Sequence, residues 1–114
     1  MIAVIFEVKP HSDKKDAYLE VAAKMRAEIE KIDGFISVER FQSITDPEKL
    51  LSLSYWRDED ALNEWRALGA HRKAQTMGRE IMFNDYRLRV ASVIRDYGMN
   101  ERDEAPEDSK ALHG

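Results

Sequence analysis

The chain has 114 residues, which is the length of one domain, because domains commonly contain about 100 to 200 residues. Its 18 basic and 22 acidic side chains give a formal charge of -4, so the composition supplies no basic field of the kind that binds nucleic acid or an anionic membrane. Cysteine is absent, which excludes disulfides, thiolate nucleophiles and thiolate-held metals.

The first half of the chain predicts a strand, a helix and a hairpin. Residues 2–9 (IAVIFEVK) are β-branched and aromatic, as in a strand. A helix then follows from residue 16, and we expect it to end at residues 33–34, where glycine can adopt the left-handed conformation. Residues 35–43 and 50–56 predict an antiparallel hairpin around a turn that contains Pro47. The apolar face of the helix has a spacing close to 3.6 residues and consists of Tyr18, Val21, Ala22, Met25, Ile29 and Ile32.

The second half predicts further helices and a last strand. A second helix is expected to begin at three acidic residues, Asp58, Glu59 and Asp60. Negative charge stabilises the N-terminus of a helix, so we interpret these residues as the beginning of the helix rather than as a metal-binding cluster. This helix is expected to end at Gly69, and another helical stretch covers about residues 70–77. Residues 86–97 alternate as in a fourth strand.

The order βαββαβ predicts an α+β fold, a ferredoxin-like antiparallel sheet with its helices on one face. The first strand is apolar on both sides, so the helix-free face also needs a cover, and we expect a symmetric homodimer rather than a monomer. The fold is expected to occupy residues 1–97. Residues 98–114 have a net charge of -3 and few large apolar side chains, and we expect them to form a disordered or loosely docked tail.

The longest wholly apolar run, residues 2–6, is far shorter than the ~20 residues that cross a bilayer. No secretion signal precedes it, so we expect a cytoplasmic protein that binds no membrane. The sequence contains none of the common phosphate, dinucleotide, hydrolase or metalloprotease motifs. With one well-placed histidine and no cysteine, we expect no metal site.

Three side chains are candidates for chemistry. Trp56 and Trp65 are each either a core aromatic or a pocket wall. His71 follows Trp65 by six residues across Gly69, so it is either a proton acceptor at the same pocket mouth or a half-exposed helix residue without a role.

Several segments resemble the antibiotic biosynthesis monooxygenase family. They are residues 33–35 (DGF), 51–62 (LSLSYWRDEDAL), 64–66 (EWR), 71–75 (HRKAQ) and 83–88 (FNDYRL), and the likeness extends over residues 1–97. The resemblance implies a dimeric α+β barrel. It also implies a monooxygenase that uses no cofactor, in which a deprotonated aromatic or quinol substrate itself reduces dioxygen.

In that scheme Trp65 forms the pocket wall and His71 is the candidate base. Trp56 and Phe6 are further candidate substrate-binding residues, and Arg87 or Arg89 is a candidate to stabilise a phenolate or peroxide anion by its charge.

Two other functions are alternatives to this scheme. The family also contains haem-degrading members, which use an asparagine on the first strand and a more distant histidine. Residues 2–8 contain no asparagine and position 75 is glutamine, which disfavours haem degradation. The alternative from another class is a dimeric small-molecule-binding or stress-response module without turnover.

Overall fold

The computed structural model describes residues 1–77, 79 and 82–114, and within this part it gives the backbone but not the side chains of residues 70, 71, 74 and 75. The described elements follow in the order β1 (Ile2–Pro10), α1 (Lys15–Ile29), β2 (Phe35–Gln42), β3 (Leu50–Trp56), α2 (Glu59–Ala67), α3 (Gly69–Met77), β4 (Phe83–Ser92) and α4 (Glu107–His113).

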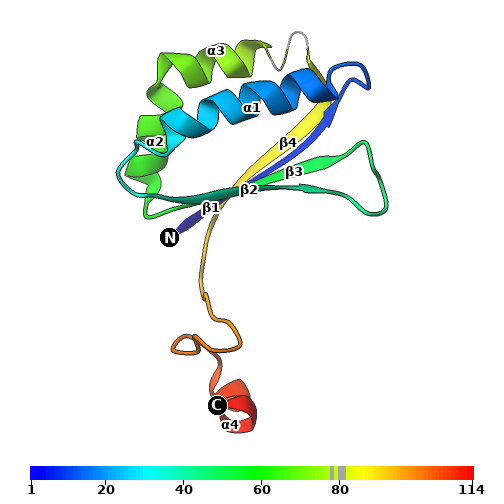
Figure 1. Ribbon diagram of the computed structural model, residues 1–114. Helices are drawn as coiled ribbons and strands as arrows, with labels where there is room; N and C mark the ends of the chain where they lie inside the picture. Colours follow the sequence, from blue (N-terminus) through cyan, green and yellow to red (C-terminus); the bar gives the residue numbers. More distant parts are fainter. Residues whose placement is uncertain (78, 80–81) are drawn as a thin grey trace.

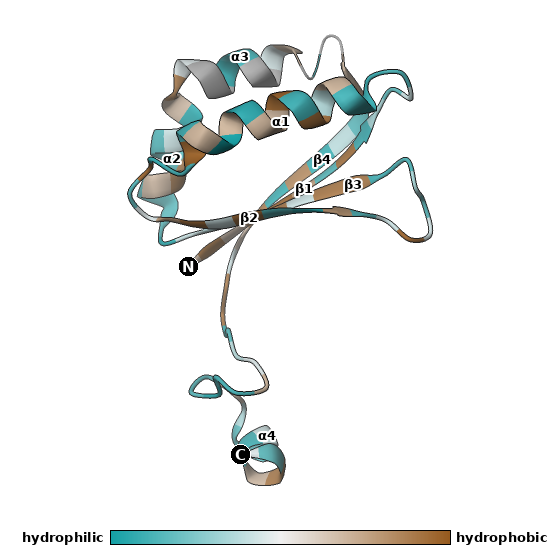
Figure 2. Ribbon diagram, viewed as in Figure 1, coloured by the Kyte–Doolittle hydropathy of each residue, from teal (hydrophilic) through white to brown (hydrophobic). Residues whose placement is uncertain are grey.

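The strands form one sheet in the order β2-β3-β1-β4, and each neighbouring pair is antiparallel. The helices α1, α2 and α3 lie over the same face of this sheet (Figure 1). Along α1, hydrophobic residues recur between hydrophilic ones, as expected of a helix with one side packed on a sheet (Figure 2). This arrangement confirms the predicted α+β, ferredoxin-like class.

Some predicted boundaries were wrong for local reasons. Helix α1 ends at Ile29, before the predicted Gly34. Gly34 has a positive φ of +94° and lies in the turn that leads into β2. Helix α2 ends at Ala67 because Leu68 is extended, and Gly69 begins α3. Strand β4 covers Phe83–Ser92 rather than residues 86–97, since its pairing with β1 ends where Ser92 faces Ile2.

The core lies between the helices and the sheet in two clusters. One is built around Trp56, Trp65 and Ile29, and the other around Val8 and Tyr18. Trp56 is 1% exposed, and its indole Nε1 donates a hydrogen bond of 3.0 Å to Ser54 Oγ. Because a buried indole N–H needs an acceptor, Ser54 holds this side chain in the core.

The opposite side of the sheet, here called the helix-free face, has no helix over it among the described residues. Strand alternation and the cross-strand register place on it Ala3, Ile5, Glu7, Ser37, Glu39, Phe41, Leu51, Leu53, Tyr55, Arg87, Arg89 and Ala91. The face therefore has an apolar centre at Ile5 and Leu53, with charged side chains on the flanking strands and at Glu7.

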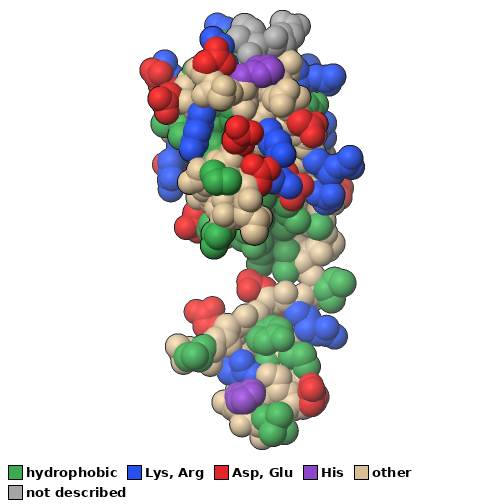
Figure 3. All heavy atoms as spheres, turned by 90° about the vertical axis from the view of Figure 1, so that its right-hand side faces the viewer, with side chains coloured by type: hydrophobic (Ala, Val, Ile, Leu, Met, Phe, Trp, Pro, Cys, Tyr) green, Lys and Arg blue, Asp and Glu red, His purple; other side chains and the backbone are tan. Residues whose placement is uncertain are grey.

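The segment 98–114 stands apart from the body (Figure 1). The side chain of Arg102 organises it, since its guanidinium donates to the carbonyl oxygens of Gly98 and Gly114 and to Ser109 Oγ. A space-filling view shows the body and this segment as two lobes joined by a narrow neck (Figure 3). A disordered or loosely docked tail in solution remains a prediction.

Within the described ranges, the helices are too short or too polar to cross a membrane.

Candidate functional site

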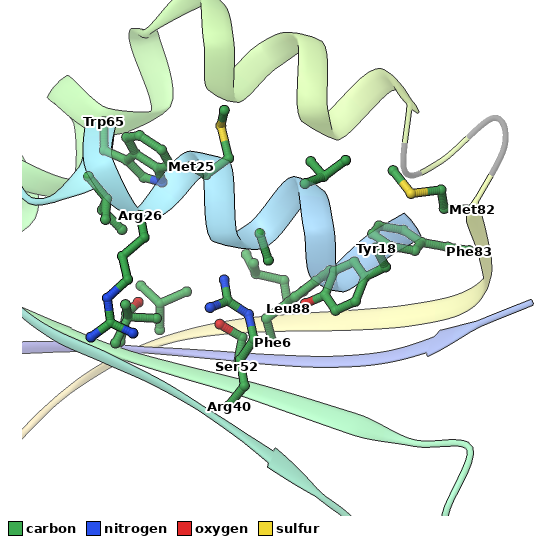
Figure 4. A pocket seen from close by; sticks show the side chains of 16 residues that line it. Phe6, Tyr18, Met25, Arg26, Arg40, Ser52, Trp65, Met82, Phe83 and Leu88 are labelled. Atoms are coloured by element: carbon green, nitrogen blue, oxygen red, sulfur yellow. The ribbon is translucent and has the colours of Figure 1, made fainter. Parts of the chain in front are cut away.

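A cavity of about 190 Å³, here called the α1 pocket, lies between α1 and the sheet (Figure 4). Its floor is a row of four residues that face one another across the sheet, one from each strand: Arg40, Ser52, Phe6 and Leu88. Its roof is one side of α1, which contributes Tyr18, Val21, Ala22, Met25, Arg26 and Ile29. Except for Arg26, these roof residues belong to the apolar helix face that the sequence predicted.

Small side chains leave room for the cavity. Ser52 and Ser54 lie on the helix-facing side of β3, and Ala22 lies on the facing side of α1. Where short side chains oppose each other across a layer, the neighbouring large residues cannot fill the gap without strain. The cavity therefore follows from the choice of serine and alanine at these positions.

Aromatic rings form the walls of the pocket. Phe6 contacts Phe83, with 5.7 Å between ring centroids, and Phe83 also contacts Tyr18 at 5.6 Å. Trp65 reaches the pocket from α2, and the oxygen of Tyr18 is directed into the cavity (Figure 4). An apolar cavity of about 150 Å³ holds a molecule the size of benzene, so this pocket has space for one substituted ring.

Two arginines bring positive charge to the pocket. Arg40 points from β2 towards α1, and Arg26 points from α1 towards the sheet (Figure 4). Arg26 is exposed at the mouth and donates a 3.1 Å hydrogen bond to Glu30. The Nε atom of Arg40 is buried and has no hydrogen-bond partner among the described residues.

A second and more open hollow adjoins the pocket and shares Phe6, Phe83 and Leu88 with it. This second hollow, here called the basic groove, is lined by Arg66, Arg72 and Arg79 among others. Since the two hollows share three side chains, the basic groove lies directly beside the pocket.

Of the residues predicted for the site, the structure brings Trp65 and Phe6 together in the α1 pocket. Trp56 lies beside them in the core and does not line the pocket among the described residues; it contacts Phe35, with 5.3 Å between ring centroids. His71 belongs to α3, but its side chain lies outside the described residues, so its position relative to Trp65 remains a prediction.

Arg87 and Arg89 do not face the pocket. Each is paired in register with a residue of the helix-free face, Glu7 and Ile5 respectively, because alternate residues of a strand point to opposite faces. Arg89 Nη1 donates a 3.1 Å hydrogen bond to Glu7, and this bond, with the charge of Lys49, lowers the pKa of the Glu7 carboxyl. The prediction that they belong to the site rested on their charge and was wrong, because strand parity places them on the helix-free face.

Asp58 caps helix α2, as the sequence favoured. Its Oδ1 accepts a 2.9 Å hydrogen bond from the Ala61 backbone N–H, and this bond together with Arg57 lowers the pKa of the carboxyl. In the part of the chain that the structure describes, no three His, Cys, Asp or Glu side chains come together as ligands for a metal.

Sequence reasoning missed Arg40, Arg26 and Tyr18 as pocket residues. A signal for Arg40 was present, since it has the same strand parity as Val38 and therefore faces the helices. Tyr18 was predicted on the apolar face of α1, but nothing in the pattern showed that a cavity would open below it.

Residues 1–77 match the family model described as antibiotic biosynthesis monooxygenase. Jasmonate monooxygenase ABM of Pyricularia oryzae is 45% identical over 101 residues, which cover 89% of this chain and 47% of that protein. The chain thus spans about half the length of this relative. Protein YqjZ of Bacillus subtilis, which is uncharacterized, is 35% identical over 94 residues, covering 82% of this chain and 79% of YqjZ.

Among solved structures, that of Rv0793 from Mycobacterium tuberculosis has a TM-score of 0.76 and 20% sequence identity, and the match covers 85% of this chain and 98% of the other. At this level of identity the likeness concerns the fold alone.

Proposed function

The chain belongs to the antibiotic biosynthesis monooxygenase family, and we propose that it is a monooxygenase that uses dioxygen to oxidise a small hydroxylated aromatic or quinol without a cofactor. The observation that carries the proposal is the α1 pocket, a ring-sized cavity of about 190 Å³ walled by Phe6, Tyr18 and Trp65. An apolar cavity with few convergent polar groups is the usual form of a small-molecule site.

In this proposal the substrate supplies all four electrons that reduce dioxygen. One oxygen atom of dioxygen bonds to a ring carbon and the other leaves as water, so a hydroquinone becomes a hydroxyquinone. The protein orients the ring against Phe6 and Trp65 and excludes water, which otherwise solvates the reactive anion. His71 is the proposed proton acceptor.

A second substrate class is favoured by one observation. The relative from Pyricularia oryzae, at 45% identity, is named for jasmonate, a small organic acid. Small apolar acids therefore stand beside phenols and quinols as candidate substrates.

Oxygen uptake tests the proposed activity. Purified, metal-stripped protein is mixed with a panel of single-ring hydroquinones and phenols, and a Clark electrode follows dioxygen. We expect uptake by the wild-type protein and a loss of most of it in the Trp65→Phe, His71→Ala double variant. Lys24→Gln is the control, because this α1 side chain is 72% exposed and does not line the pocket.

Uptake by the wild-type protein no faster than by the double variant would contradict the proposal. Tight binding of an aromatic ligand without any oxygen consumption would instead favour the alternative, a binding module without turnover.

We also propose that two copies of the chain pair through the helix-free face. Ile5, Leu51 and Leu53 are only partly covered within one chain, and Phe41 on the same face is 43% exposed. A second copy related by twofold symmetry would present the same apolar patch to this one.

A further inference from the structure

We infer that the α1 pocket holds its ligand by an anionic oxygen group, a carboxylate or a phenolate, bound to the guanidinium of Arg40. The inference rests on the proposed function and narrows the class of substrate that the same pocket takes.

The first argument is the state of Arg40. Its Nε is buried, and no described residue accepts a hydrogen bond from it. None of the ion pairs among the described residues includes this side chain. A buried donor on a charged group is costly when it stays unsatisfied, so an acceptor from a ligand in the pocket would stabilise it.

The second argument is the shape of the donor. A guanidinium presents Nε–H and one Nη–H side by side, which matches the two oxygens of a carboxylate and also accommodates a single phenolate oxygen. Arg40 reaches the cavity from the sheet, and the oxygen of Tyr18 is directed into the same space (Figure 4). A ring lying against Phe6 can therefore place its anionic substituent at Arg40.

The third argument is the local sign of the charge. The chain as a whole has a net charge of -4. The described residues that line the α1 pocket and the adjoining hollow nevertheless include Arg26, Arg40, Arg66, Arg72 and Arg79, and no aspartate or glutamate. A hollow with one sign of charge attracts ligands of the opposite sign. The basic groove thus favours the entry of an organic anion.

Arg26 has a smaller role than Arg40 in binding the anion. It is exposed, and its hydrogen bond to Glu30 partly neutralises it at the mouth. Its expected contribution is to the approach of the anion rather than to its final position.

Isothermal titration calorimetry tests the inference with matched ligands. We expect 4-ethylbenzoate to bind the wild-type protein about tenfold or more tightly than the neutral 4-ethylbenzamide, because hydrogen bonds to a charged acceptor are about twice as strong as neutral ones. Arg40→Gln should abolish this preference and leave the binding of the amide within about twofold. Arg40→Lys, which retains the charge but not the fork, should give an intermediate preference.

A second ligand pair identifies the kind of anion. Binding of 4-nitrophenol is measured at mildly acidic pH, where it is neutral, and at mildly alkaline pH, where it is ionised, with 4-ethylbenzamide at both pH values to report any change in the protein. A preference for the ionised form that depends on Arg40 supports a phenolate ligand, and an Arg40-dependent preference for the benzoate supports a carboxylate. Lys24→Gln, which removes a positive charge from α1 outside the pocket, should bind all ligands like the wild type.

Equal binding of the charged and neutral ligands, an unchanged preference in Arg40→Gln, or binding of none of the compounds would each overturn the inference. These outcomes are separate from the failure of the proposed function, because binding is measured without turnover. Oxygen uptake with a neutral substrate would still support the monooxygenase.

Discussion

Gly34 occupies the turn before β2, where two constraints exclude a side chain. Its φ is +94°, and a Cβ at this position would lie 2.8 Å from Ala61 Cβ and 3.2 Å from Cζ of Arg57. Its carbonyl oxygen also accepts a 2.7 Å hydrogen bond from the Arg57 N–H. The residue therefore allows the beginning of α2 to pack directly against the turn.

We expect Gly34→Ala to destabilise the protein by at least about 1–3 kcal/mol, which is the usual cost of a strained backbone conformation before the close contact with Ala61 is added. Chemical denaturation measures the change. The matched control is Gly69→Ala, since no described atom lies within 4 Å of a Cβ at Gly69 and its φ is not positive. Equal stabilities of the two variants would contradict this account of Gly34.

For single residues, the alternation of side chains along a strand predicted core packing better than it predicted the residues of the pocket. The alternation of residues 50–56 places Trp56 on the same side of the strand as Ser52 and Ser54, and the structure has this arrangement. Arg40 was overlooked although the same alternation applies to its strand. A charged side chain that faces the helices indicates a binding site only when the residues opposite it are small enough to leave a cavity.

At the scale of elements, the boundaries of β3 were predicted at the residues where the structure has them. The end of α1 was not, because a glycine with positive φ serves a turn as readily as a helix cap. Helices α2 and α3 were expected as two pieces, and the break between them lies at Leu68. Sequence patterns predict well whether a segment is a helix or a strand, whereas the ends of the segment depend on contacts with other elements.

The cap of α2 makes stability depend on pH. In the folded protein the pKa of Asp58 is lowered from 3.8, first by the hydrogen bond from the Ala61 N–H and then by Arg57. The ionised carboxylate therefore stabilises the fold, and this contribution is complete above the unfolded pKa and is lost as the pH falls through the lowered folded pKa.

We expect Asp58→Ala to lower the melting temperature by a few degrees at pH 7, because the variant lacks the cap of the helix. The difference from the wild type should shrink as the pH falls below about 3.8. Thermal melts followed by circular dichroism over a pH series measure it. Asp58→Asn, whose amide oxygen can also cap, should lose less stability at neutral pH. A difference that is independent of pH would argue against the carboxylate as its source.

At the scale of the whole molecule, the sheet has more apolar surface than its own helices cover. Helices lie over one face, while the helix-free face presents Ile5 and Leu53 beside an ion pair between Glu7 and Arg89. A second cover for this face is expected from sequence, because β1 is apolar on both sides, and it stays a prediction. Phe6 and Trp65 were predicted at the site, whereas Arg26 and Arg40 were not, because their place in the pocket depends on how α1 and β2 come together in space.

The proposed homodimer leads to a prediction about mass. Sedimentation equilibrium at micromolar concentration should give about twice the chain mass of 13.2 kDa. Ile5→Lys combined with Leu53→Lys places two like charges opposite each other at the centre of the helix-free face, and removing both from water is so costly that the variant should sediment as a single chain. Leu19→Lys is the control, because Leu19 is 37% exposed on α1, away from that face. A monomeric wild type, or a folded double variant that still pairs, would show that another surface covers the sheet.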